Sequence, residues 1–151
     1  MKIRISSFMA GPLILFAFFG AAISAELLNG PLAARIVRVI DGDTLVVRVH
    51  IWLDQDVETR VRLFGIDTPE IRGKCPEERL MALDARALVE KTGGDDEVFL
   101  HDVRYGKFAR RVVARVSSAH SAGFATALLQ SGLARPYDGG KRLSWCNTKL
   151  N

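Results

Sequence analysis

The sequence predicts an α+β fold, in which a small five-stranded β-barrel carries two or three helices. Five segments are rich in β-branched and other apolar residues and are separated by turn-forming residues, as the strands of a small barrel are. One longer segment with helical periodicity lies between the third and the fourth of them. With 151 residues, 48% of them hydrophobic, the chain has room for one domain with an ordinary core.

Turn and loop signals bound the strands. The first two strands are joined by a short turn whose Asp41-Gly42 pair suits a positive φ angle. Polar and acidic residues at 52–59 predict a loop, or the tip of a longer hairpin, before the third strand. A basic turn separates the last two strands. The strands are expected at residues 34–40, at 45–51, from 60 onward, at 97–101 and at 111–117.

Two helices complete the prediction. The first is expected from Pro76 or Glu77 to Lys91, because proline and acids suit a first turn and glycines follow the last residue. Its apolar residues recur every three or four positions and predict a stripe that faces the core, made of Leu80, Leu83, Ala87 and Leu88. The second helix is expected at 122–131, ended by Gly132. One helix after the third of five strands matches a Greek-key barrel of the OB type.

Residues that carry chemistry are concentrated where the third strand ends. A proline there cannot donate to a strand ladder, so Asp67 and Glu70 should lie on one side of the loop that leaves the strand. Arg62 and Asp67 have opposite parity and would face opposite sides of a straight strand. We therefore expect a bulge at Gly65 that brings them together. Taken singly, each of these charged residues would be an ordinary solvated residue at a strand end.

A second motif, Asp41-Gly42-Asp43-Thr44, precedes this stretch. The two motifs together resemble the staphylococcal nuclease (thermonuclease) family in residue identity, order and spacing. The resemblance continues at 105–114 and 131–134 and covers residues 34–137. It implies a calcium-dependent nuclease that hydrolyses phosphodiester bonds of DNA and RNA and leaves 3′-phosphate ends. The alternative is a non-catalytic OB-type module that only binds nucleic acid.

The resemblance also assigns roles to the acidic residues. Asp43, Asp67 and an oxygen of Thr68 would bind the metal, an oxygen-only set of the kind that a hard divalent cation requires. Calcium is the ion that the family implies, although these residue types would also accept magnesium. The general base of the family falls on Glu70, near a metal-bound or phosphate-bound water. A glutamate there can also order the water without taking its proton.

Two arginines would bind the phosphate, since a planar guanidinium can donate two hydrogen bonds to it. The first falls on Arg62. For the second, alignment on the following strand selects Arg111, whereas an ungapped count from Lys107, which stands where the family usually has arginine, selects Arg110. Lys107 and Arg110 belong to a basic cluster that can hold phosphates or form a solvated hairpin. Tyr137 is expected either to stack on a base or to cover the end of the barrel.

The N-terminus has the layout of a secretory signal peptide, because Lys2 and Arg4 precede an apolar run that ends in small residues. Cleavage after Ala25 would give a secreted or periplasmic monomer with no obligate protein partner, with 19 basic against 17 acidic side chains. That charge permits a polyanionic substrate without arguing for one. An uncleaved segment would instead be a membrane anchor. The chain would then divide into a signal peptide at 1–25, a linker at 26–33, the nuclease domain at 34–137 and a tail at 138–151.

Export would place Cys75 and Cys146 in an oxidising compartment, where an even number of cysteines favours one disulfide. The bond would tie the loop after Glu70 to the tail. It would close a loop of about 70 residues and stabilise the fold by roughly 4 kcal/mol in the chain-entropy model. Two unpaired buried thiols are the alternative.

Overall fold

The computed structural model describes residues 26–94, 97–107, 110–121 and 123–146. The expected signal peptide and the last five residues of the tail lie outside the described residues. The elements are, in order, β1 (Leu27–Leu28), β2 (Leu32–Asp41), β3 (Thr44–Trp52), β4 (Gln55–Leu63), β5 (Ile66–Asp67), α1 (Pro76–Gly93), β6 (Glu97–Tyr105), β7 (Arg111–Ser118), α2 (Phe124–Gln130) and β8 (Arg135–Pro136).

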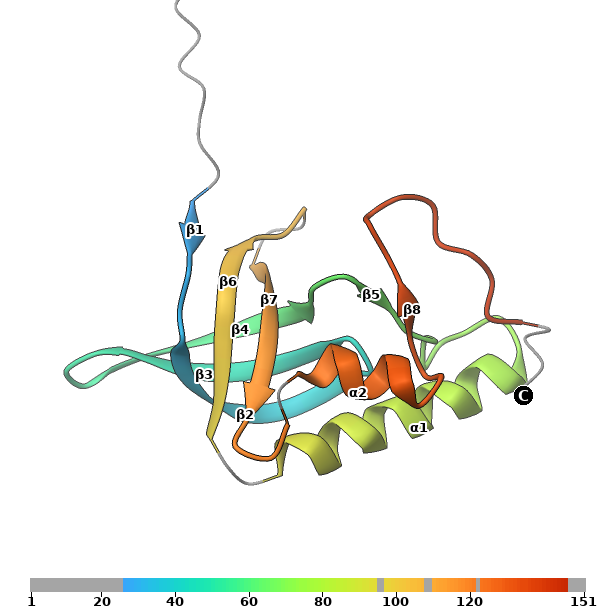
Figure 1. Ribbon diagram of the computed structural model, residues 1–151, viewed down its shortest axis with the longest axis horizontal. Coiled ribbons are helices and arrows are strands. Elements are labelled where there is room, and N and C mark those ends of the chain that lie inside the picture. Colours follow the sequence, from blue (N-terminus) through green and yellow to red (C-terminus); the bar gives the residue numbers. More distant parts are fainter. Residues whose placement is uncertain (1–25, 95–96, 108–109, 122, 147–151) are drawn as a thin grey trace, which may run out of the picture.

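Five strands form a closed barrel (Figure 1), in the order β6-β2-β3-β4-β7, and a further pairing of β6 with β7 closes it. The pairing of β4 with β7 is parallel and the other barrel pairings are antiparallel. The helix α1 follows the third barrel strand, and both helices lie along one side of the barrel (Figure 1). The predicted α+β fold with an OB-type barrel is therefore confirmed.

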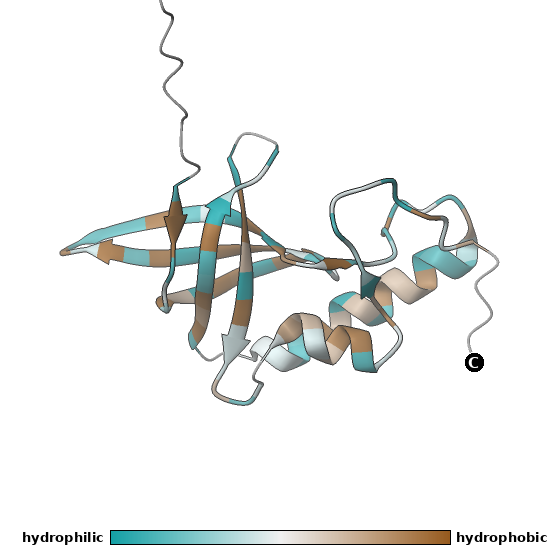
Figure 2. Ribbon diagram, turned by 45° about the horizontal axis from the view of Figure 1, so that its top comes forward, coloured by the Kyte–Doolittle hydropathy of each residue, from teal (hydrophilic) through white to brown (hydrophobic). Residues whose placement is uncertain are grey.

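The barrel interior is built by alternation along the strands. In β3 the side chains of Leu45, Val47 and Val49 are buried, and in β4 those of Val61 and Leu63 are. Figure 2 shows hydrophobic and hydrophilic residues alternating along the strands. Each fully buried aliphatic side chain contributes about 1.5–3 kcal/mol relative to its exposed state, so this alternation accounts for much of the barrel's stability.

Two segments differ from the expected boundaries. Strand β4 begins at Gln55, because the chain turns at Asp54, which has a φ of 56°, and 52–59 is the tip of a long hairpin. The segment expected to be a linker contributes β1, in which Leu27 and Leu28 pair with Arg104 and Val103 of β6. Both differences lengthen the sheet without changing the order of the barrel strands.

The predicted core face of α1 is wrong for Leu80, Leu83 and Ala87, which are exposed, whereas Leu88 is half-buried and packs against the core as expected. Leu80 and Leu83 are 64% and 51% exposed, and the buried face carries Met81, Ala82, Ala85 and Val89 instead. The reason is the short distance between the helix and the turn before β3: a Cβ added to Gly42 would lie 2.7 Å from the Cβ of Ala85. A small residue is needed at this close approach, and Leu80 and Leu83 lie on the exposed side of the helix. No helix within the described ranges is long and apolar enough to cross a membrane.

Candidate active site

The turn between β2 and β3 presents Asp43, which is only 2% exposed. Its Oδ1 accepts hydrogen bonds from Nη1 of Arg62 at 2.6 Å and from Oγ1 of Thr44 at 2.9 Å. Its Oδ2 accepts one from the backbone N–H of Thr68 at 3.3 Å. Thr44 pairs with Arg62 across the β3–β4 ladder, so the strand register itself places this arginine beside Asp43.

The chain bends sharply between β4 and β5, where Gly65 has a φ of +81°. Such a torsion suits glycine and interrupts a flat strand, as the parity of Arg62 and Asp67 requires. After the bend, Nη2 of Arg62 lies 4.0 Å from Oδ1 of Asp67 and donates to the carbonyl oxygen of Ile66 at 3.4 Å. Arg62 therefore joins Asp43 to Asp67, and the structure brings the two expected metal-binding aspartates together.

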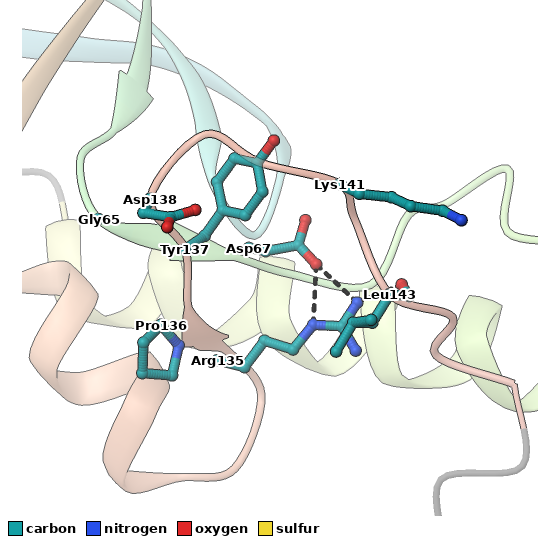
Figure 3. A pocket seen from close by; sticks show the side chains of 8 residues that line it. All are labelled: Gly65, Asp67, Arg135, Pro136, Tyr137, Asp138, Lys141 and Leu143. Atoms are coloured by element: carbon teal, nitrogen blue, oxygen red, sulfur yellow. Dashed lines mark hydrogen bonds and ion pairs between the residues drawn. The ribbon is translucent and has the colours of Figure 1, made fainter.

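The carboxylate of Asp67, 1% exposed, is surrounded by donors from the C-terminal part of the chain. Its Oδ2 accepts hydrogen bonds from Nε and Nη2 of Arg135 at 3.1 and 2.9 Å (Figure 3), and from Nε1 of Trp145 at 3.0 Å. Oδ1 is bonded to Nε of Arg142. Sequence reasoning missed Arg135, Arg142 and Trp145; the available signal was a basic, Trp-containing tail in a chain with a buried acidic site.

Arg142 contacts three of the expected site residues at once. It bonds to Asp67, its Nη1 bonds to Oε1 of Glu70, and its Nη2 donates to the carbonyl oxygen of Thr68 at 2.9 Å. Burial acts to lower the pKa of Arg142, but the Asp67 and Glu70 carboxylates outweigh it and raise the pKa above its ordinary value. A cationic group of this protein thus lies among the oxygens expected to bind a metal.

The segment that carries Arg142 is anchored by a disulfide between Cys75 and Cys146, whose Cα atoms are 5.8 Å apart. Next to it, the buried carboxylate of Glu78 accepts hydrogen bonds from the N–H groups of Lys74 at 2.9 Å and Glu70 at 3.5 Å. Cys75, Glu78 and Cys146 lie as close together as metal ligands would. Their two sulfur atoms are bonded to each other, so this group is a structural anchor for the loop that carries Glu70.

Asp41, expected to be only a turn former, is an acidic neighbour of the site. Burial, and then the charge of Asp43, raise its pKa to about 6. Several carboxylates therefore lie close together. The potential metal ligands are carboxylate and carbonyl oxygens, which a hard divalent cation prefers. Asp43, Asp67 and the carbonyl of Thr68 fit such an ion. Asp41 lies next to this group, and its Oδ1 accepts a hydrogen bond from the backbone N–H of Asp43.

The geometry favours Arg111 over Arg110 as the second arginine. In the parallel β4–β7 pair, Arg60 is opposite Arg111 and Arg62 is opposite Val113. Side chains two positions apart on a strand share a face, so Arg111 lies on the same face of the sheet as Arg62. Arg110 is exposed in the hairpin turn with a φ of +62°. Lys107 is exposed in the same turn.

Tyr137 lies beside the carboxylates, at the wall of a pocket of about 440 Å³ (Figure 3). Its backbone N–H donates to the carbonyl of Gly65 at 2.9 Å, and its hydroxyl donates to the carbonyl of Gly140 at 2.7 Å. The Cζ atom of Arg62 lies 6.0 Å from the ring centroid. The pocket is lined by Gly65, Asp67, Arg135, Pro136, Tyr137, Asp138, Lys141 and Leu143. An aromatic face, a lysine and an arginine therefore border the acidic site.

An OB-type barrel with buried carboxylates at one edge, arginines beside them and an aromatic pocket belongs to the class of OB domains, whose members bind oligonucleotides or oligosaccharides. The model of the staphylococcal nuclease homologue family matches residues 60–145, and the chain belongs to this family. Two relatives, both described as an uncharacterized endonuclease, come from Escherichia coli O157:H7 and Escherichia coli. Each is 33% identical over 106 residues, which cover 68% of this chain and 59% of the relative. The chain therefore matches little more than half the length of these relatives.

Proposed function

We propose that this protein is a calcium-dependent nuclease that hydrolyses phosphodiester bonds of DNA and RNA and leaves 3′-phosphate ends. The observation that carries the proposal is the position of Arg62, which contacts Asp43 and lies 4.0 Å from Asp67 at the barrel edge. A guanidinium that binds phosphate thus stands directly beside oxygens that suit a hard cation. Membership of the nuclease family and the endonuclease relatives support this assignment.

Three side chains would carry out the proposed hydrolysis. Arg62 and Arg111 bind the scissile phosphate and stabilise the negative charge that accumulates on it as the water attacks. Glu70 takes a proton from the water as the new O–P bond forms and the bond from phosphorus to the 5′ oxygen breaks. The 5′ oxygen then leaves with a proton from solvent. Calcium, when bound, supplies positive charge that neutralises the phosphate beside the carboxylates.

The partly exposed Glu70 side chain suits this role. It is half exposed, at the rim of the site, while Asp43 and Asp67 are buried. Its backbone N–H is held by Glu78, which fixes the loop without covering the carboxylate. Tyr137 would stack on a base beside the scissile bond, and Lys107 and Arg110 would contact phosphates further along the strand.

We also propose that the protein is exported and acts as a secreted or periplasmic monomer on nucleic acid. The signal-peptide pattern of the first 25 residues supports export. So does the Cys75–Cys146 disulfide, because such bonds persist mainly in oxidising compartments.

Digestion of single-stranded DNA by the mature chain tests the function. We expect cleavage with calcium, none with a chelator, and a loss of about 10²–10³-fold in rate for Glu70→Gln. Glu77→Gln is the matched control, since Glu77 is exposed in the first turn of α1. Cleavage that survives chelation would refute the calcium requirement. DNA binding without cleavage by any form would favour the non-catalytic binding module.

A further inference from the structure

We propose that Arg142 is an internal cation that competes with calcium for the carboxylates of Asp67 and Glu70, and that the Cys75–Cys146 disulfide sets the strength of this competition. The inference rests on the proposed function, because it concerns how that site is regulated. The C-terminal segment 138–146 would then inhibit calcium binding at the site.

The contacts of Arg142 are those of a bound cation. Its guanidinium bonds to one carboxylate oxygen of Asp67, to one of Glu70 and to the carbonyl of Thr68. Asp67 and Thr68 are two of the three residues that fit the metal, and Glu70 is the expected base. A divalent cation and this guanidinium therefore need the same oxygens, and both cannot have them at once.

The other donors to Asp67 do not compete in this way. Arg135 and Trp145 bond to Oδ2 of Asp67 and leave Oδ1 to Arg142, with Arg62 4.0 Å away. Arg135 also stacks on the ring of Trp145, with Cζ 4.2 Å from the centroid, and donates to the backbone carbonyls of Leu143 and Ser144, so Asp67 is only one of its partners. Of these donors to Asp67, Arg142 is the one that also bonds to Glu70, and its release would free an oxygen on each of the two acids.

The competition is intramolecular because Arg142 belongs to the same chain, and the disulfide holds the segment at a second point close to the site. Cys146 lies four positions after Arg142 and is bonded to Cys75, in the loop between Glu70 and α1. A tethered competitor acts at an effective concentration set by the tether, in the millimolar range for short flexible segments. Without the disulfide the tail would be attached at one end only and Arg142 would visit the site less often, so the carboxylates would bind calcium more tightly in the reduced protein.

Calcium titration by isothermal calorimetry, with no substrate present, tests the proposal. We expect Arg142→Gln to bind calcium about tenfold more tightly than the wild type. Lys91→Gln, which makes the same charge change on an exposed side chain in the last turn of α1, should shift the affinity much less. The Cys75→Ser/Cys146→Ser double variant, with its fold verified by circular dichroism, should also bind calcium more tightly than the wild type.

Several results would overturn the proposal. Arg142→Gln with unchanged or weaker calcium affinity would do so, as would an equal shift from Lys91→Gln. Unchanged affinity together with a slower cleavage rate would make Arg142 a substrate-binding residue instead. If wild type and variants all bind calcium equally and cleave DNA, only this inference fails. If none of them binds calcium or cleaves, the proposed function fails as well.

Discussion

The two halves of the candidate site are held together by different forces. Asp43 and Arg62 lie on neighbouring strands, and the register that pairs Thr44 with Arg62 places them side by side. Arg142 and Trp145 reach Asp67 from 75 and 78 positions further along the chain, through side-chain bonds and one disulfide. The barrel half is therefore positioned by strand register, whereas the segment after β8 is positioned by side-chain hydrogen bonds to the acidic residues and by a covalent bond at its end.

The largest expected effect concerns the barrel half. Arg111→Lys should lower the rate of DNA cleavage by about 10²–10³-fold, because lysine keeps the charge but loses the two-pronged donor. Arg110→Lys, the adjacent control in the exposed turn, should change the rate little. Initial rates on single-stranded DNA with calcium measure both. Equal effects of the two substitutions would contradict the assignment that the β4–β7 register supports.

The next effect concerns the attachment of the tail. Reduction of the Cys75–Cys146 bond should lower the free energy of unfolding by on the order of 4 kcal/mol, because the bond closes a loop across a separation of 71 residues. Urea melts with and without reducing agent measure the change. The Cys75→Ser/Cys146→Ser variant, insensitive to reductant, is the control. If the reductant does not change the urea concentration at the midpoint of unfolding, the disulfide does not contribute to stability.

A smaller effect tests how tightly the barrel half is packed. Ala85→Leu should destabilise the fold by about 1–3 kcal/mol, since Ala85 is fully buried against the turn that carries Asp43. Leu83→Gln, on the exposed face of the same helix, should stay within about 0.5 kcal/mol of the wild type. Thermal or urea unfolding compares them. A larger loss of stability for Leu83→Gln than for Ala85→Leu would indicate that Leu83 faces the core.

The smallest effect concerns pH. The pKa of Asp41 is raised to about 6 from its ordinary 3.8, so ionisation costs folding free energy; this cost is absent below pH 3.8 and complete above about pH 6. Without calcium, Asp41→Asn should therefore raise stability at pH 7 by about 1 kcal/mol, which is part of the roughly 3 kcal/mol that such a shift represents because solvent screens this half-buried group, and have little effect below pH 4. Urea melts with a chelator at both pH values test this, with the exposed Asp84→Asn as control. A gain of the same size at both pH values would exclude titration of Asp41 as its cause.

Much of the barrel half could be predicted from the sequence, since strand alternation and turn residues are local signals. The bend at Gly65 followed from the opposite parity of Arg62 and Asp67, and φ there is indeed positive. The core face of α1 could not be predicted, because leucine periodicity does not show how closely a helix approaches its neighbour. Ala82 and Ala85 fit where a leucine would not.

The contacts of the C-terminal tail with Asp67 could not be predicted from the sequence, for a related reason. The bonds of Arg135, Arg142 and Trp145 to Asp67 are made across long sequence separations by side chains without a repeating pattern. Asp41 was read as a turn former because Asp-Gly is a strong turn signal by itself. Its raised pKa depends on burial beside Asp43, which only the folded chain creates.

Gly42 lies where the turn that carries Asp43 packs against helix α1 and against the loop at Thr68. A side chain there would meet Ala85 at 2.7 Å and Thr68 at 3.1 Å, so the turn, the helix and the loop touch at one crowded point. Close-packed contacts are nearly incompressible, and a shift of the Asp43 turn must push on its neighbours. Amide exchange in the middle of α1 should therefore report events at the Asp43 carboxylate, which lies in the turn that packs against Ala85.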